Sequence, residues 1–437
     1  MSSRSLTDAF KFNCGILPES TAKIVVGLSG GADSVTLLHL ICTNPDLLPP
    51  NCAVEAVYVH HGISSKADSW SEFCAGLCRT LHVDFCEERV VLDSNFSNVE
   101  AQAREKRYRA LASHLDSNSV LATAHHLNDL VETFLLALKR GSGLPGLSAM
   151  GVLQKFAGGL IWRPLLDSSR AEIEAYTGAH GLSYVTDDSN FDIRYDRNFF
   201  RHEIVPRLVE HFPEYLDSIR KSAAYIHEAQ VIVDQVAEQD LYELADSSGS
   251  LELYGYRLLS PERQHNVLRR YIHGVTGKYP SAQLLQQFDK DFVDARTDSV
   301  PVLKMDGWEL RKFRERLYIV RSSDLNFGTS GQVEPGMTVT VLARSYRMME
   351  SDSGGYRLAP DSKIELCYDY SFSLKIHPYN RSMRRELKKL FSEYGIAYWE
   401  RRFIPVVKID GRVAGLFPNY IDAEFYTPDK GHRFVEV

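Results

Sequence analysis

The sequence predicts an α/β fold: a Rossmann-like parallel sheet with a phosphate-binding loop, followed by a helical domain and a small α+β domain at the carboxyl end. Strand and helix patterns alternate up to about residue 190, and a glycine pair directly follows the first strand pattern. Helical patterns without strands then run from about 205 to 300. The chain has 437 residues, more than one hydrophobic core usually supports, so two or three domains are expected.

Short apolar, β-branched runs alternate with helical patterns in the first part of the chain. Strands are predicted over 23–28, 53–59, 83–91 and 120–124, and helices over 34–42, 67–81, 98–115 and 127–139. This alternation implies a parallel sheet covered on both faces, which binds ligands at the carboxyl ends of its strands. The phosphate loop, His60–Gly62 and His125–His126 each follow a strand, so we expect them to meet at that edge.

The remainder of the chain changes in character. Apolar residues from Leu216 to Val236 keep a three-or-four spacing that predicts an amphipathic helix, and a second helix follows Ser260. Alternating segments at 338–342 and 404–409 surround a basic helix predicted over 381–394. We therefore divide the chain into an α/β domain (1–205), a helical domain (206–321), a linker rich in Ser, Gly, Asn and Pro (322–337) and a basic C-terminal domain (338–437).

The composition is that of an ordinary globular protein, with 44% apolar and 24% charged residues. No run approaches the roughly 18 apolar residues of a membrane span, and the first ten residues lack a signal-peptide core, so we expect a cytoplasmic protein without a membrane partner. The seven cysteines are expected to be free, small, buried side chains. Cys74 and Cys78 share a helix face, but no further ligands accompany them at suitable spacing, so a zinc or redox site is not expected.

The string Ser-Gly-Gly-Ala-Asp-Ser after the first strand predicts a phosphate-binding loop. Its glycines let the backbone approach an anion, and the dipole of the following helix favours negative charge there. Asp33 stands where a kinase-type loop has lysine, and phosphates repel a carboxylate unless a divalent cation lies between them. A capped glycine turn is the structural alternative. We expect ATP and Mg²⁺ to bind here, with Asp33 as the metal ligand, at Ser29, Gly30, Gly31, Ala32, Asp33 and Ser34.

A second motif follows the fourth strand. His125, Asp129 and Glu132 are spaced to share one face at the amino end of a helix, directed toward the ATP edge. Two carboxylates in a partly desolvated cleft could hold a cationic substrate or a metal, and His125 could contact a phosphate. An N-cap cluster that complements the helix dipole is the structural alternative. The opposite, core-facing side of this helix is expected to carry Leu130, Phe134, Leu135 and Leu138.

Arginines lie on two further predicted helices in the first 205 residues. Arg104 lies near the start of a helix, where it could neutralise phosphate charge; surface pairing with Glu100 or Glu105 is the alternative. Arg197 and Arg201 share a helix face suited to a phosphate or base, although this helix could also be a capped connection between domains.

A basic segment interrupts the otherwise acidic chain, whose net charge is −7. Between residues 375 and 412, ten basic side chains face four acidic ones, which leaves +6. This density suits phosphate contact, and five interleaved aromatic residues suit base stacking; a solvated basic helix is the alternative. The aromatic residues are Tyr379, Tyr394, Tyr398, Trp399 and Phe403.

The phosphate loop resembles that of the N-type ATP pyrophosphatases, which adenylate an oxygen atom of their substrate. Longer strings make the chain similar to the tRNA(Ile)-lysidine synthetase family over nearly its whole length. One departure is Asn128, where that family commonly has an acid. The similar strings are Ser29–Ser34, Val59–Gly62, Glu100–Tyr108, Thr123–Met150, Arg163–Leu166, Asp187–Arg201 and Lys388–Pro405.

The resemblance implies a ligase that adenylates the 2-oxo group of the wobble cytidine of a CAU-anticodon tRNA(Ile) and then transfers L-lysine to that position. It implies catalytic roles for Asp33, Arg104, His125, Asp129 and Glu132, with the last two also binding lysine. A tRNA thiolase and a non-catalytic, nucleotide-dependent RNA-binding protein are the alternatives, and the chain has no Cys-x-x-Cys pair. Nothing in the sequence indicates an oligomeric state. The expected tRNA-binding residues are Arg197, Arg201, Arg384, Arg385, Lys388, Lys389, Arg401 and Arg402.

Overall fold

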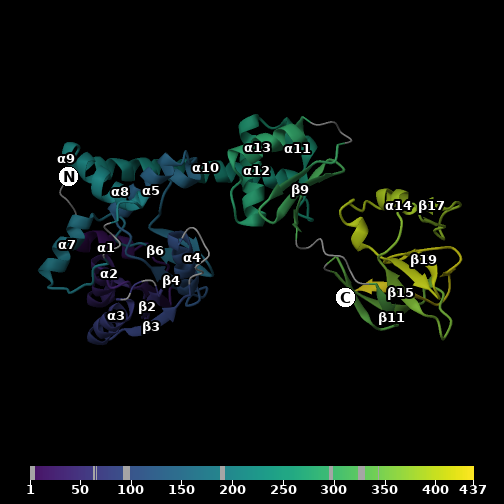
Figure 1. Ribbon diagram of the computed structural model, residues 1–437, viewed down its shortest axis with the longest axis horizontal. Helices are drawn as coiled ribbons and strands as arrows, with labels where there is room; N and C mark the ends of the chain where they lie inside the picture. The colour runs from purple at the N-terminus through teal and green to yellow at the C-terminus, as the bar shows by residue number, and fades with distance from the viewer. Residues whose placement is uncertain are drawn as a thin grey trace. The chain divides into compact units, whose positions relative to one another are not determined.

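The computed structural model describes residues 5–62, 64, 66–91, 99–187, 192–294, 299–322, 330–342 and 344–437 (Figure 1). The chain forms two compact units, Met1–Val233 and Asp234–Val437. Within the described ranges, no helix has both the length and the apolar character needed to cross a membrane.

A six-stranded sheet forms the centre of the first unit, in the order β3-β2-β1-β4-β6-β5. Five strands are parallel, and β5 is antiparallel to β6. The four predicted strands are confirmed, but the β5–β6 hairpin is absent from the predictions because each strand has only four residues and no clear alternation. The bounds are β1 Lys23–Gly27, β2 Ala53–His60, β3 Asp84–Arg89, β4 Ser119–Ala122, β5 Leu153–Phe156 and β6 Gly159–Trp162.

Helices cover both faces of this sheet (Figure 1). On one face, residues of α1, α2, α3 and α7 share a core cluster that includes Phe10, Leu37 and Trp162; on the other, Leu111 of α4 packs against Val25. The four predicted helices are confirmed to within a few residues at each end. The bounds are α1 Leu6–Cys14, α2 Ala32–Thr43, α3 Ala67–Leu81, α4 Val99–Ala112, α5 Leu127–Lys139, α6 Leu144–Leu147 and α7 Arg170–Ala179.

The core face of α5 largely follows its prediction. Leu130, Phe134 and Leu135 are buried, and the first two pack against Ala223 of α10. Leu138 is 57% exposed, so its predicted core position is wrong: it lies next to the helix end, beyond the residues that α10 covers.

Short helical segments lead from the sheet to a long helix, α10. The apolar spacing from Leu216 to Val236 predicts this long helix, which is confirmed. The bounds are α8 Asp196–Phe199, a π-helical turn Phe200–Ile204, α9 Val205–His211 and α10 Tyr215–Leu244.

The part of the chain between 251 and 321 combines helices with an antiparallel sheet in the order β7-β10-β9-β8. The helix after Ser260 is confirmed, but a purely helical domain over 206–321 is wrong. Glu309 and Lys312 are buried in β9, and these buried charges conceal the strand's apolar alternation in the sequence. The bounds are α11 Leu253–Leu258, α12 Pro261–Thr276, α13 Ala282–Phe288, β7 Leu251–Glu252, β8 Val302–Met305, β9 Trp308–Phe313 and β10 Arg316–Arg321.

The C-terminal part is mainly antiparallel β-structure, with two five-stranded sheets and a two-stranded one. The predicted basic helix begins only at Leu387, because Arg385–Glu386 pairs with Lys375–Ile376 as a strand. Of the predicted linker, residues 323–329 lie outside the described residues, and 331–333 form a strand rather than a connection. The bounds are α14 Leu387–Glu393, β11 Gly331–Val333, β12 Thr338–Val341, β13 Arg344–Ser351, β14 Gly355–Tyr356, β15 Ile364–Cys367, β16 Lys375–Ile376, β17 Arg385–Glu386, β18 Val406–Ile409, β19 Arg412–Leu416, β20 Tyr420–Ile421, β21 Tyr426–Thr427 and β22 Gly431–Glu436.

Trp162 is expected to be a major source of stability in the first unit. It is fully buried, and its indole N–H donates to the Asn13 carbonyl oxygen at 3.1 Å. Trp162→Ala should lower the free energy of unfolding by about 3–5 kcal/mol, through the cavity and the unpaired carbonyl. Urea unfolding measures the effect; the control Val91→Ala, at a position 83% exposed, should change it by less than about 0.5 kcal/mol. Equal effects of the two substitutions would contradict this assignment.

Candidate active site

The predicted phosphate loop connects β1 to α2 and has the backbone that an anion site requires. Gly30 has φ +83°, and a Cβ there would lie 2.9 Å from Val185 Cγ2 and 3.1 Å from Cys74 Sγ, so only glycine fits. Ser34 Oγ accepts from Ser29 N–H at 3.2 Å and donates to the Gly31 carbonyl oxygen at 3.0 Å, which fixes the loop's shape. No side chain of the described residues caps the start of α2, so its first N–H groups suit an anionic ligand.

His126 joins this loop to the segment after β4. Its Nε2 lies 3.8 Å from Asp33 Oδ2 and 3.4 Å from Asp129 Oδ2, and its side chain is only 1% exposed. Burial raises the pKa of Asp33, as does the nearby Asp129, while His126 lowers it. The expected meeting of these two segments at the sheet edge is therefore confirmed, through a histidine that the site prediction omitted.

His125, the histidine that the sequence analysis favours, lies between β4 and α5, next to His126, and is neutral. Its Nδ1 is 2.9 Å from Thr123 Oγ1, and burial, with the nearby Arg163 and Arg197, lowers the pKa of His125 to about 3. A neutral imidazole with one nitrogen held in this way can donate or accept a single hydrogen bond at the other.

His60 and His61, expected at the same edge, contact residues of α3 and α4. His60 Nε2 lies 3.2 Å from Asp68 Oδ1. Arg107 Nε donates to His61 Nε2 at 3.1 Å, and burial, together with Arg107, lowers the pKa of His61 to about 4.

Asp129 and Glu132 share a helix face as predicted, and each is paired with both Arg197 and Arg201. Arg197 donates to Asp129 Oδ1 and Glu132 Oε2, both at 2.8 Å. Arg201 donates to Asp129 Oδ1 at 3.0 Å and to Glu132 Oε1 at 2.7 Å. We call these four side chains the acid–arginine cluster. The sequence assigns its acids to lysine and its arginines to tRNA, but the structure brings all four together.

Charge pairing decides the ionisation of this cluster. Burial would raise the pKa of Asp129, but His126 and the two arginines outweigh burial and lower it. Glu132 is 1% exposed and Asp129 is 11% exposed, whereas the two arginines are 20–25% exposed. Loss of one partner would leave a buried charge uncompensated, so the four side chains form one electrostatic unit.

Arg104 and Arg163 are two further cations near this edge. Arg104 is exposed and lies over the Tyr108 ring at 5.0 Å. Of the two acids expected as its alternative partners, Glu105 pairs with Arg109 at 2.8 Å, and the side chain of Glu100 lies outside the described residues. Arg163 directly follows β6 and is 8% exposed; its Nη1 donates to the Gly151 carbonyl oxygen at 2.8 Å. Its buried Nε has no hydrogen-bond partner among the described residues. Arg163 is not among the predicted site residues. The only signal for it in the sequence is the string Arg163–Leu166, which is similar to the family.

Asn128, the departure from the family, contacts the neighbouring helix. Its Oδ1 accepts a hydrogen bond at 3.0 Å from the backbone N–H of Arg170, the first residue of α7. An uncharged amide therefore links the starts of α5 and α7.

The predicted RNA-binding segment is only partly available for contact. Trp399 and Phe403 are buried, so the prediction that they stack on bases is wrong. Tyr379 and Tyr394 each have one ring face covered, by Tyr426 and Tyr420, at centroid distances of 3.7 and 3.8 Å. Arg401 is half-buried and donates to the Ile396 carbonyl oxygen at 3.2 Å, and Arg385 is half-buried in β17. The predicted basic residues that remain exposed are Arg384, Lys388, Lys389 and Arg402.

Comparison with protein families identifies three matching domains. A PP-loop domain covers residues 4–208, a TilS substrate binding domain covers 251–318, and a TilS substrate C-terminal domain covers 365–430. With the loop geometry above, these matches define a PP-loop enzyme that uses ATP.

The chain belongs to the tRNA(Ile)-lysidine synthase family. It is 35% identical over 431 residues to the tRNA(Ile)-lysidine synthase of Vibrio parahaemolyticus, which covers 97% of this chain and 98% of that one. It is 34% identical over 428 residues to that of Proteus mirabilis, covering 94% and 96%. These matches support a ligase that forms lysidine on tRNA(Ile) with ATP, and they do not favour a thiolase or a non-catalytic protein. The solved U34-tRNA thiolase NcsA from Methanococcus maripaludis is only 18% identical, with a TM-score of 0.43, covering 51% of this chain and 79% of that one, and is too distant to bear on function.

The buried, neutral His125 predicts a pH dependence of stability. Its pKa is about 3 in the folded protein and 6.5 ordinarily, so the unfolded chain binds more protons between these values. Stability from His125 is therefore present above pH 6.5 and is lost as the pH falls toward 3. His125→Gln should reduce the slope of unfolding free energy against pH by up to about 1.4 kcal/mol per unit, in urea unfolding between pH 7 and pH 5. The exposed His211→Gln is the matched control, and an unchanged slope in His125→Gln would contradict the assignment.

Proposed function

We propose that this enzyme joins L-lysine to the wobble cytidine of CAU-anticodon tRNA(Ile) in two steps at the carboxyl edge of the parallel sheet. The observation that carries the proposal is the contact of His126 with both Asp33 and Asp129, because it unites the phosphate loop with the acid–arginine cluster. The same site can then hold the α-phosphate of ATP in the first step and the amine of lysine in the second step.

In the first step, the 2-oxo oxygen of cytidine attacks the α-phosphorus of ATP, and the bond to pyrophosphate breaks. The uncapped N–H groups of α2 and the glycine loop bind the leaving pyrophosphate. Arg104 neutralises charge on the phosphates, and His125 supplies a hydrogen bond without adding charge.

Asp33 fits the Mg²⁺ that such a loop implies. Burial raises the pKa of this carboxyl, and a second carboxylate, Asp129, raises it further, so a divalent cation would stabilise the ionised form. When bound there, Mg²⁺ neutralises charge on the triphosphate and on the departing pyrophosphate.

In the second step, the neutral ε-amine of lysine attacks C2 of cytidine, and the C2–O bond breaks to release AMP. We propose that the acid–arginine cluster binds the zwitterionic end of lysine. Asp129, the more exposed acid, takes the α-ammonium, and Arg197 or Arg201 takes the α-carboxylate. Glu132 is nearly inaccessible and holds the two guanidinium groups in position rather than contacting lysine.

The Asp129 role is tested with purified protein, CAU tRNA, ATP and labelled lysine. Asp129→Asn should reduce lysine transfer by about 100-fold or more, because the neutral amide cannot pair with the ammonium or hold both arginines. The exposed Asp196→Asn is the control and should retain transfer. Near-normal transfer in Asp129→Asn would contradict its role. Wild-type binding of tRNA and ATP without AMP release would contradict the proposed reaction itself.

The exposed basic residues of the C-terminal part are proposed to contact tRNA phosphates. Substituting Arg384, Lys388 and Lys389 by alanine should weaken tRNA binding and reduce the slope of log K against log salt by about 0.7–0.9 per lost phosphate contact. Filter binding at several salt concentrations measures both quantities. The exposed Lys363→Ala is the control; an unchanged slope in the triple variant would place the tRNA contacts elsewhere.

A further inference from the structure

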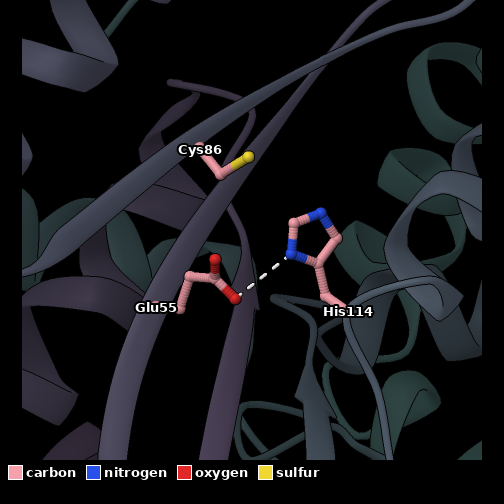
Figure 2. Close-up of side chains that lie close together, drawn as sticks. All are labelled: Glu55, Cys86 and His114. Atoms are coloured by element: carbon pink, nitrogen blue, oxygen red, sulfur yellow. Dashed lines mark hydrogen bonds and ion pairs between the residues drawn. The ribbon is translucent and has the colours of Figure 1, made fainter.

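Figure 2 shows a second group of ligand-type side chains, in the first unit. It lies toward the amino ends of β2 and β3, whereas the phosphate loop follows the carboxyl end of β1. Glu55 is near the start of β2, Cys86 is in β3, and His114 follows the end of α4. Cys86 pairs with Val57 in the strand register, so Glu55 and Cys86 point to the same face of the sheet, the face that α4 covers.

The three side chains present one oxygen, one sulfur and one nitrogen to a common point. One ligand atom from each lies within 4.8 Å of the other two. Glu55 Oε2 is 3.2 Å from His114 Nδ1, and the Cys86 thiol points toward the histidine ring (Figure 2). Bonds of about 2.0–2.3 Å to tetrahedral zinc place ligand atoms roughly 3.5 Å apart, so modest side-chain rotations would close the group.

His114 has the outer partner that metal-binding histidines usually have. Its Nε2 lies 3.1 Å from Glu88 Oε1, on the side of the ring away from Glu55. With a metal ion on Nδ1, the Glu88 carboxylate would hold the proton on Nε2 and orient the ring, as carboxylates do for metal-binding histidines. His114 is 13% exposed and Glu55 20%, so an ion can enter from solvent.

We propose that Glu55, Cys86 and His114 bind a divalent transition-metal ion of the zinc type, with solvent as the fourth ligand. Thiolate, imidazole and carboxylate together match zinc better than Mg²⁺ or Ca²⁺, which prefer oxygen alone. This site is separate from the proposed Mg²⁺ at Asp33. It would tie β2 and β3 to the end of α4, the helix that carries Arg104.

Lys23 is the cation that competes with such an ion. Its Nζ lies 2.7 Å from Glu55 Oε2 and 3.5 Å from the His114 carbonyl oxygen. Binding of the ion would displace this ammonium from the oxygen, so removing the charge of Lys23 should favour the metal.

Cobalt(II) titration of the full, metal-stripped protein tests the proposal. The wild type should bind one Co²⁺ with a thiolate-to-cobalt charge-transfer band, and Zn²⁺ should displace it. Cys86→Ser should abolish the band, and His114→Gln and Glu55→Gln should weaken Co²⁺ binding at least about 10-fold. Cys52→Ser, a change at another half-buried cysteine, should leave the band intact.

Lys23→Met should tighten Co²⁺ binding, because it removes the ammonium that competes for Glu55. This variant tests the proposal without removing a ligand. Apo variants are compared by their thermal midpoints, so that a folding defect is distinguished from lost ligation. The absence of a charge-transfer band in the wild type, or a band that survives Cys86→Ser, would overturn the proposal.

Discussion

The buried pairing of Asp129 and Glu132 with Arg197 and Arg201 is the interaction on which the candidate site depends. It joins α5, which starts at the carboxyl edge of the sheet, to the helical turns around residues 196–204. Four charges this close are stable only as a set, because each acid is desolvated and each arginine compensates two acids. His126 then connects this set to Asp33, so the glycine loop and the acid–arginine cluster share one electrostatic environment.

Sequence patterns predicted those parts of the site whose structure depends on residues close together in the chain. The glycine pair, the buried strand before it and the spacing of Asp129 and Glu132 led to the loop, the sheet edge and the helix face. The pairing of Asp129 with Arg197 joins residues 68 positions apart, which no local pattern reveals. The predicted catalytic residues left out His126, which lies beside Asp33, for a related reason: backbone direction at a strand end decides which of two adjacent side chains faces the loop.

Burial overrides composition in the second unit. The alternation of β9 is obscured by Glu309 and Lys312, whose charges are buried in the fold. In the C-terminal part, aromatic residues that look suited to nucleic acid are used for packing: Trp399 makes edge contacts with Phe313 and Tyr318, at 6.1 and 5.3 Å. What remains for the proposed tRNA contact is charge on exposed side chains, which would provide affinity rather than sequence discrimination.

The central claim is that one cluster holds both charged groups of free lysine, so the α-carboxylate matters as much as the amines. The most direct measurement compares kcat/KM for lysine and for cadaverine, which has both amines but no carboxylate. If Arg197 or Arg201 binds that carboxylate, cadaverine should be poorer by about 100-fold or more, because it cannot form the charge-assisted hydrogen bonds between the carboxylate and the guanidinium. Equal kcat/KM values for lysine and cadaverine would contradict the account.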